Sequence, residues 1–117
     1  MNLLGLVACQ AAYETGEEWL EAVKKYIWEN FLFLKRYLEE QMPQIRVFVP
    51  QGTYLVWVDF RELGLTEKER EELLDRAGIW LDSGAMFGPD GEGFERVNIA
   101  CPRRTLEEAL RRLREAL

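Results

Sequence analysis

The stretch that decides the fold runs from residue 94 to residue 103 and reads FERVNIACPR. Its first seven residues are predicted to form a β-strand, which the proline near the end of the stretch interrupts because proline has no backbone N–H to donate. Side chains alternate between the two faces of a strand. Val97 and Ile99 are therefore expected to point into a core, and Arg96 and Asn98 to point to the opposite face.

Arg96 and Asn98 would place a guanidinium beside an amide on one face of this strand. An arginine side chain presents two parallel N–H donors that match both oxygens of a carboxylate. The pair is therefore a candidate binding site for a carboxylate ligand. The solvated outer face of a sheet would show the same pattern, so the residues alone leave both interpretations open.

The segments around this strand predict four strands and four helices. Strands are expected at residues 45–49, 53–60, 79–81 and 94–100, with a glycine-rich loop at 82–93. Helices are expected at residues 3–13, 15–42, 66–77 and 105–117. Thr15, Thr66 and Thr105 each precede a glutamate by three residues, a spacing typical of the capping box that begins a helix. The first two strands read as a hairpin around the turn Pro50-Gln51-Gly52.

This order predicts an α+β fold in two layers. A small, mainly antiparallel sheet would be covered by helices and preceded by a long helix. The whole chain, residues 1–117, is expected to form a single domain, in which residues 1–42 are a long helical segment. The first helix is apolar on most sides, so it is expected to require a partner surface.

Composition excludes several classes of function. The formal net charge of -6, with acidic and basic residues mixed along the helices, argues against a nucleic-acid-binding protein. No apolar run approaches the length of about 20 residues that a membrane span requires. The chain has no histidine and no CxxC spacing, so a zinc site is not expected. Cys9 and Cys101 are expected to be reduced thiols.

Other side chains give weaker indications. Tyr54 follows the hairpin turn and is a further candidate site residue, although cross-strand packing would place it there equally well. The four tryptophans are interpreted as core or interface residues: Trp19, Trp28, Trp57 and Trp80. The four lysines lie within or beside helices among polar residues, where their pKa values would not be lowered for Schiff-base chemistry. No catalytic residue is therefore predicted.

Several segments together carry a resemblance that covers nearly the whole chain. They are Asn2-Leu3-Leu4-Gly5, Ala11-Ala12-Tyr13, Trp19-Leu20, Pro50 to Leu55 with Trp57, Asp59-Phe60-Arg61, Gly84 with Phe87-Gly88, and Gly93 to Arg103. The chain resembles the C-terminal small domain of fold-type I pyridoxal-phosphate (PLP) enzymes of the class I/II aminotransferase superfamily. Within it, the chain is most similar to cystathionine beta-lyase-like C–S lyases of the MalY/PatB type. One departure is Gln51, where that family usually has glutamate.

The resemblance implies a role for Arg96, which would bind the α-carboxylate of the amino-acid substrate, with Asn98 and Tyr54 as secondary contacts. The parent enzyme would be a PLP-dependent lyase that catalyses β-elimination from cysteine or cystathionine. Its Schiff-base lysine and the other PLP-binding residues would lie in a large domain upstream, to which residues 1–42 would form a bridge. We therefore expect the chain to bind no PLP and to be inactive in isolation, as a fragment or truncated product.

Two alternatives stay open at this point. An aminotransferase would use the same cofactor and the same small domain. A stand-alone, non-catalytic module would instead self-associate into a homo-oligomer through exposed apolar surface. For each of them a cytoplasmic location is expected, without a nucleic-acid or membrane partner.

Overall fold

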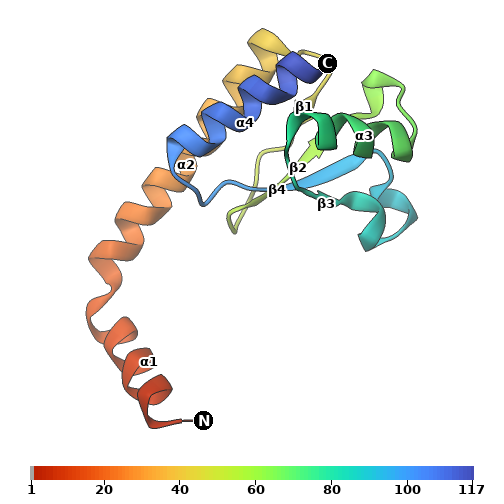
Figure 1. Ribbon diagram of the computed structural model, residues 1–117. Helices are drawn as coiled ribbons and strands as arrows, with labels where there is room; N and C mark the ends of the chain where they lie inside the picture. The colour runs from red at the N-terminus through yellow and green to blue at the C-terminus, as the bar shows by residue number, and fades with distance from the viewer. Residues whose placement is uncertain (1) are drawn as a thin grey trace.

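The computed structural model describes residues 2–117 (Figure 1). Its helices are α1 (Leu3–Thr15), α2 (Glu17–Gln41), α3 (Glu67–Ala77) and α4 (Arg103–Ala116). Its strands are β1 (Arg46–Val47), β2 (Leu55–Asp59), β3 (Asp82–Ser83) and β4 (Phe94–Asn98). Three short 3-10 turns complete the chain: η1 (Arg61–Leu63), η2 (Gly84–Phe87) and η3 (Pro89–Gly91). The predicted order of helices and strands is confirmed.

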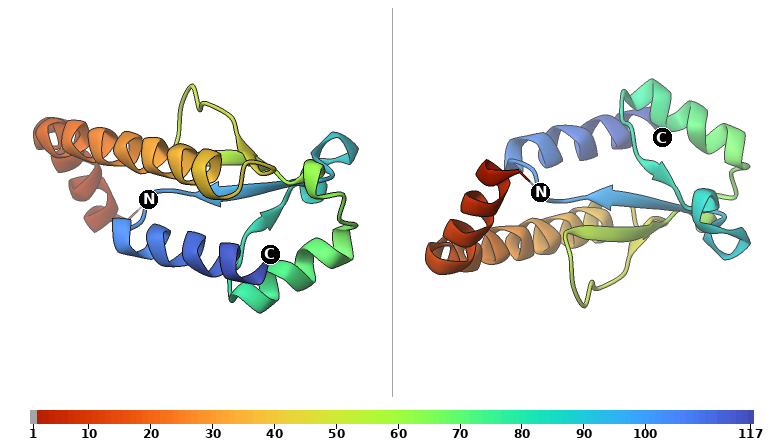
Figure 2. Two further views of the ribbon diagram at one scale, coloured as in Figure 1. Left: turned by 90° about the horizontal axis from the view of Figure 1, so that it is seen from above. Right: turned by 90° about the horizontal axis from the view of Figure 1, so that it is seen from below.

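The four strands form one antiparallel sheet in the order β1-β2-β4-β3. β2 and β4 pair along their full lengths, with Val56 opposite Val97 and Trp57 opposite Arg96. Helices α2, α3 and α4 lie against one face of this sheet (Figure 2). The fold is therefore α+β in two layers, as predicted, and no helix of residues 2–117 covers the second face of the sheet.

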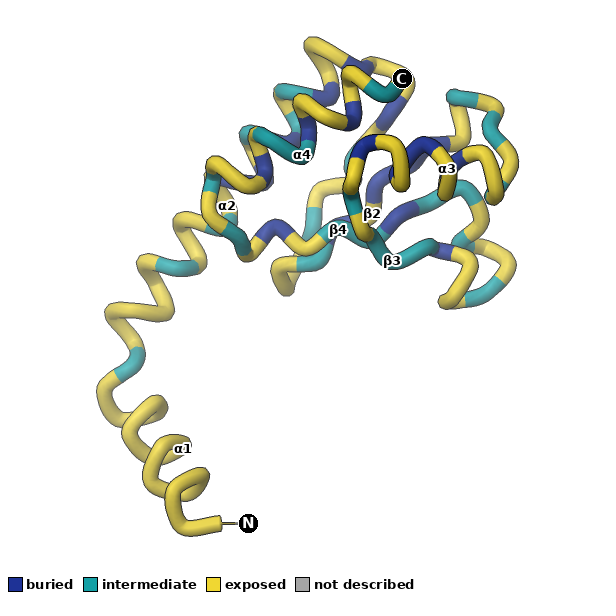
Figure 3. The backbone as a smooth tube through the Cα atoms, in the orientation of Figure 1, coloured by how far each residue is buried: buried dark blue, intermediate teal, exposed yellow. Residues whose placement is uncertain are grey.

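The core lies between that helical layer and the covered face of the sheet (Figure 3). The strands contribute alternate side chains to it, as the pleat requires: Val56 and Val58 from β2, and Ile99 just beyond the end of β4. The helices contribute the leucines of α3 and α4 and the C-terminal half of α2. The buried helical residues in this cluster are Phe31, Leu34, Leu38, Leu73, Leu74, Leu106, Leu110 and Leu113.

The apolar stripe of α2 is buried over only part of its length. Phe31, Leu34 and Leu38 contact the core, whereas Trp19, in the first turn of the helix, is 69% exposed. No residue of α1 is buried. The N-terminal segment therefore projects away from the domain (Figures 1 and 3). Among residues 2–117, α1 has no packed face, and its requirement for a partner surface stays a prediction.

Two of the three predicted capping boxes are wrong, for local reasons. Thr15 ends α1, and its hydroxyl donates to the carbonyl of Ala11 at 2.8 Å, so it does not cap α2. The chain bends instead at Gly16, where a Cβ atom would lie only 2.3 Å from the Ala12 carbonyl oxygen. Thr105 lies inside α4, which begins after Pro102.

The capping box at Thr66 is confirmed. The Thr66 hydroxyl accepts the backbone N–H of Glu69, and the Glu69 carboxylate accepts the backbone N–H of Thr66 at 2.9 Å. Helix α3 then ends at Gly78, which adopts a left-handed conformation with φ 63°. Such a conformation favours glycine, because it lacks a Cβ atom.

The predicted strand at residues 79–81 is displaced. Pairing with β4 begins only at Asp82, where Asp82 and Ser83 lie opposite Arg96 and Glu95. Trp80, in the segment before it, is 95% exposed. The other tryptophans also reach the surface, since Trp28 is 45% and Trp57 is 36% exposed. The tryptophans are therefore not core residues of this domain, and their alternative assignment to an interface stays a prediction.

A buried ion pair connects α3 to the covered face of the sheet. Arg70 of α3 and Glu95 of β4 each have side chains that are 2% exposed, and Nε of Arg70 donates to the Glu95 carboxylate at 2.8 Å. A second nitrogen of Arg70 donates to Glu67 in the first turn of α3. Burial raises the pKa of the Glu95 carboxyl, and the Arg70 guanidinium opposes that shift. Each charge thus depends on the other to be tolerated in the core.

Replacing Arg70 with methionine would leave Glu95 without its partner. We expect the Arg70→Met variant to lose about 3–5 kcal/mol in the free energy of unfolding, the usual cost of an uncompensated buried charge. Urea denaturation followed by circular dichroism measures it. Lys68→Met on the exposed side of the same helix is the matched control and should change stability by less than about 0.5 kcal/mol. Equal stabilities of the two variants would contradict this account of the pair.

Candidate functional site

The candidate site lies on the face of the sheet that the helices of the described chain leave open. Arg96 of β4 points to this face, because its neighbours Glu95 and Val97 point to the core side. The predicted alternation along β4 is confirmed for Arg96 and for the buried Ile99. The side chain of Arg96 is 30% exposed, so it reaches solvent from a partly enclosed position.

Asp82 of β3 holds one edge of the Arg96 guanidinium. Nε and Nη2 of Arg96 both donate to Oδ2 of Asp82, at 3.1 and 2.6 Å. The two residues lie directly opposite each other in the antiparallel pair β3–β4, so this is a cross-strand ion pair. The side chain of Asp82 is 42% exposed, and such partly solvated pairs contribute only modestly to stability.

Aromatic rings surround the guanidinium on the same face. Its carbon lies 4.7 Å from the centre of the Phe87 ring, within the range of a cation–π contact. Trp57, opposite Arg96 in β2, packs edge-on against Phe87 and Phe94, with ring centres 5.4 and 6.2 Å apart. Aromatic contacts therefore line the open face beside Arg96, while the ion pair stays partly solvated.

Asn98 and Tyr54 have different surroundings from Arg96. The Asn98 side-chain oxygen accepts the backbone N–H of Ala100 at 2.9 Å, so it stabilises the end of its own strand. The carbonyl of Tyr54 accepts the backbone N–H of Ile99, and its side chain borders a groove of about 570 Å³ between the N-terminal half of α2 and residues 50–54. Arg96 does not border that groove. In this chain the three predicted residues therefore do not share a set of contacts.

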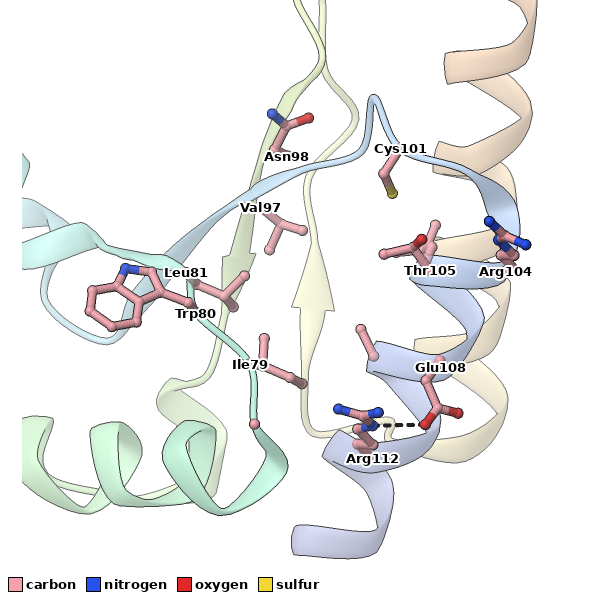
Figure 4. Close-up of a pocket in the computed structure, with 13 residues that line it drawn as sticks. Ile79, Trp80, Leu81, Val97, Asn98, Cys101, Arg104, Thr105, Glu108 and Arg112 are labelled. Carbon is pink, nitrogen blue, oxygen red and sulfur yellow. Dashed lines mark hydrogen bonds and ion pairs between the residues drawn. The ribbon is translucent and has the colours of Figure 1, made fainter.

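A second hollow, of about 610 Å³, lies on the other side of the sheet (Figure 4). It separates α4 from the segment around Trp80, and Val97 points into it. Arg112 at its rim donates to Glu108 at 2.7 Å. Asn98 also borders this hollow, whereas Arg96 does not, so the hollow is not a pocket around the Arg96 guanidinium.

The attachment of β3 determines where Asp82 lies. The Ser83 hydroxyl donates to the Glu67 carboxylate, and this bond, with the Arg70 guanidinium, holds the pKa of Glu67 below its usual value. Gly84 packs so closely that a Cβ atom there would lie 2.1 Å from the carbonyl oxygen of Gly91. A strand of two residues is thus fixed by side-chain and backbone contacts on either side of it.

The lysines of this chain lie at exposed or partly exposed positions on helices. Lys24, Lys25 and Lys35 lie on α2 and Lys68 lies on α3. Three of them are paired with a glutamate on the same helix, and their side chains are 43% to 84% exposed. A Schiff-base lysine instead requires an enclosed, desolvated position. The residues present therefore do not fit this cofactor by themselves.

Two further site types find no support in residues 2–117. No group of three or more His, Cys, Asp or Glu residues is arranged to hold a metal ion in this part of the chain. Among the same residues, no helix has the length and apolar character required to cross a membrane.

The fold and the site together define a class of protein domain. The fold matches the small domain of PLP enzymes. It has an antiparallel sheet that helices cover on one face, a long helix before the sheet, and Arg96 on the open face. Cystalysin from Treponema denticola, whose crystal structure contains PLP, superposes with a TM-score of 0.94 at 39% identity, over 98% of this chain and 29% of that chain. A PLP-bound protein of Clostridium difficile 630, named a candidate aminotransferase, gives a TM-score of 0.94 at 46% identity, over 98% of this chain and 30% of its own.

The curated relatives give the more particular assignment. Cystathionine beta-lyase PatB of Bacillus subtilis is 35% identical over 118 residues, which cover 100% of this chain and 30% of PatB. The chain is homologous to the C-terminal part of MalY/PatB-type cystathionine beta-lyases and of PLP-dependent aminotransferases, and this confirms the resemblance seen in the sequence. It spans about 30% of the length of these relatives, and the rest of them has no counterpart in the 117 residues. No protein-family model matches the chain.

The sequence pattern missed Asp82 and Phe87, the two residues that contact the Arg96 guanidinium. Both fall in the stretch interpreted as a glycine-rich loop, and the preceding strand was placed at 79–81 instead of at Asp82. The residues Asp82-Ser83-Gly84 do not by themselves predict a strand. The pairing of Asp82 and Ser83 with β4 depends on a contact between Ser83 and Glu67 of α3, which is distant in sequence.

The Ser83–Glu67 bond predicts a pH-dependent contribution to stability. The folded-state pKa of Glu67 is lowered, so its contribution is present above the unfolded value of about 4.3 and is lost as the pH falls through the folded-state pKa. We expect Ser83→Ala to be less stable than the wild type at pH 7 and this difference to shrink as the pH falls from 7 to 3. Urea denaturation at several pH values measures it.

Glu67→Gln provides the control for this experiment. In that background, Ser83→Ala should have an effect that no longer changes with pH, because the titrating carboxylate is gone. A difference between wild type and Ser83→Ala that stays constant from pH 7 to pH 3 would refute the link to Glu67.

Proposed function

We propose that this chain is the small domain of a PLP-dependent C–S lyase of the cystathionine beta-lyase type, and that Arg96 binds the α-carboxylate of its amino-acid substrate. The observation that carries the proposal is an arginine held on the open face of the sheet by an ion pair and an aromatic ring. Homology to cystathionine beta-lyases over the whole chain supports the choice of substrate class.

The proposed role of Arg96 follows from its geometry. Two nitrogens of the guanidinium bind Asp82, and the third, Nη1, makes no hydrogen bond to residues 2–117. A planar carboxylate can therefore accept two parallel N–H groups from the outer edge, formed by Nη1 and Nη2. Fixing the carboxylate in this way would set the orientation of the substrate Cα for the chemistry that follows.

The remaining chemistry is proposed to come from residues outside this chain. PLP, when bound in the complete enzyme, would act as the electron sink for β-elimination. The exposed lysines of α2 and α3 do not provide its anchor. The unburied apolar residues of α1 and of the first half of α2 would pack on the large domain that provides it. We therefore propose that the chain alone has no lyase activity.

An aminotransferase is the second candidate, because the chain has homology to an aspartate aminotransferase of Pyrococcus horikoshii as well, at 33% identity over 110 residues. The small domain itself does not separate the two reactions. Genomic DNA upstream of the first codon would separate them if it encodes, in frame, a large domain similar either to that of the C–S lyases or to that of the aminotransferases. A sequence without such a domain there would favour the stand-alone module.

The role of Arg96 can be tested in a chimera. The matching C-terminal segment of Bacillus subtilis PatB is replaced by this chain, and pyruvate release from L-cystathionine is measured. We expect Arg96→Lys in the chimera to lower kcat/KM by about 10- to 100-fold, because hydrogen bonds to a charged group contribute roughly 1.5–3 kcal/mol. Lysine keeps the charge but loses the two parallel donors.

Arg104→Lys, at an exposed position in α4, is the matched control and should leave kcat/KM unchanged. Absorbance of bound PLP and gel filtration establish first that each chimera is folded and loaded. A loaded Arg96→Lys chimera with the kinetics of its parent would refute the carboxylate-binding role.

A further inference from the structure

The Arg96 guanidinium has two edges, and Asp82 uses only one of them. A single oxygen, Oδ2, accepts from both Nε and Nη2, on the edge nearer the strand. The opposite edge, formed by Nη1 and the second hydrogen of Nη2, makes no hydrogen bond to residues 2–117. The ion pair therefore orients the guanidinium without using the pair of donors that best matches a carboxylate.

An aromatic ring contacts the guanidinium as well. The guanidinium carbon lies over the Phe87 ring at 4.7 Å from its centre, and Phe87 is itself in edge-on contact with Trp57 at an interplanar angle of 84°. Trp57 in β2 and Asp82 in β3 lie opposite Arg96 in the two neighbouring strands. Arg96 is thus contacted from one face and one edge, while its outer edge is left open.

Asp82 occupies a position that its own surroundings hold in place. The next residue, Ser83, donates to the Glu67 carboxylate, and Glu67 is bound by the buried Arg70. Gly84 follows in a contact with Gly91 that excludes a side chain. A change at the Asp82 carboxylate should therefore alter Arg96 while the backbone of β3 stays where it is.

We propose that Asp82 is a positioning residue for Arg96, acting together with Phe87. It holds the guanidinium so that the Nη1–Nη2 edge faces outward, and the carboxylate of an amino acid binds end-on at that edge; this role rests on the proposed function of Arg96. An arginine side chain has many rotamers, and ordering it in advance removes that entropic cost from substrate binding. It also leaves one edge available, which favours a planar carboxylate in a single orientation.

The first test uses the full 117-residue chain and requires no activity. NMR of 15N-arginine-labelled protein measures the exchange of the Arg96 Nε–H proton with water. We expect Asp82→Ala to accelerate this exchange about two- to fivefold, the range typical of partly exposed ion pairs, and Asp82→Asn, which keeps a neutral acceptor, to recover part of the protection. Asp90→Ala, an exposed acidic residue in the same loop, is the matched control and should have no effect.

Backbone amide signals of β3 and β4 show whether the sheet is intact in each variant. If Asp82→Ala disturbs them, Asp82→Asn carries the test, and faster exchange in it supports the proposal. Unchanged Arg96 exchange in a variant with an intact sheet would overturn it.

The second test measures kinetics in the PLP-loaded chimera with PatB. A positioning role should raise KM for L-cystathionine severalfold in Asp82→Ala with kcat nearly unchanged, and Asp82→Asn should restore part of it. A lower KM in Asp82→Ala would show that Asp82 competes with the substrate, and this would overturn the proposal.

The two proposals can fail separately. If Arg96→Lys leaves the kinetics unchanged, the carboxylate role fails even where Asp82 is shown by NMR to order Arg96. If Arg96→Lys impairs the chimera and Asp82→Ala changes neither proton exchange nor KM, the positioning role fails alone.

Discussion

The ion pair between Arg70 and Glu95 is the constraint on which the rest of this domain depends. It places a carboxylate in the core-facing row of β4, where only a buried and hydrogen-bonded cation makes its charge tolerable. Because side chains alternate along a strand, a shift of β4 by one residue would expose Glu95 and bury Arg96. Arg70 therefore fixes the register that turns Arg96 outward. The same guanidinium binds Glu67, and through it the short strand that carries Asp82. The inner and outer faces of the sheet are in this way connected by a short series of polar contacts.

The site is arranged by pairing across strands more than by the loops around it. Arg96 receives its ion-pair partner from β3 and an aromatic neighbour from β2, each directly opposite in the sheet. The helices contribute to the site only indirectly, because they pack against the opposite face of the sheet. This arrangement explains how a domain with strands of two to five residues can hold one long side chain in a defined orientation.

Features that depend on local chemistry could be predicted from the sequence. The order of elements, the capping box at Thr66, the left-handed Gly78 and the outward direction of Arg96 all follow from short patterns, and the structure confirms them. The predicted helix starts at Thr15 and Thr105 are wrong. The chain bends at Gly16, so α2 begins after it, and α4 begins directly after Pro102. Glu95 alternates with Arg96 and so falls at a core-facing position, which indicates a buried carboxylate in need of a cation. Its partner Arg70 could not be identified, because it lies 25 residues away along the chain. The strand at Asp82 and the contact with Phe87 could not be predicted, because they depend on the packing of separate segments.

The exposure of all four tryptophans has a consequence for how this domain is studied by spectroscopy. Trp19, Trp28, Trp57 and Trp80 are in contact with solvent in the folded chain, at 36% to 95% of their surface. The emission of Trp80, which is 95% exposed, should therefore resemble that of a tryptophan in an unfolded polypeptide and report unfolding poorly. The same indoles lie on α2, on the open face of the sheet and beside the hollow next to α4. In variants that keep a single tryptophan, a blue shift of emission would consequently report another surface covering the domain, and the position of that tryptophan would identify which face has been covered.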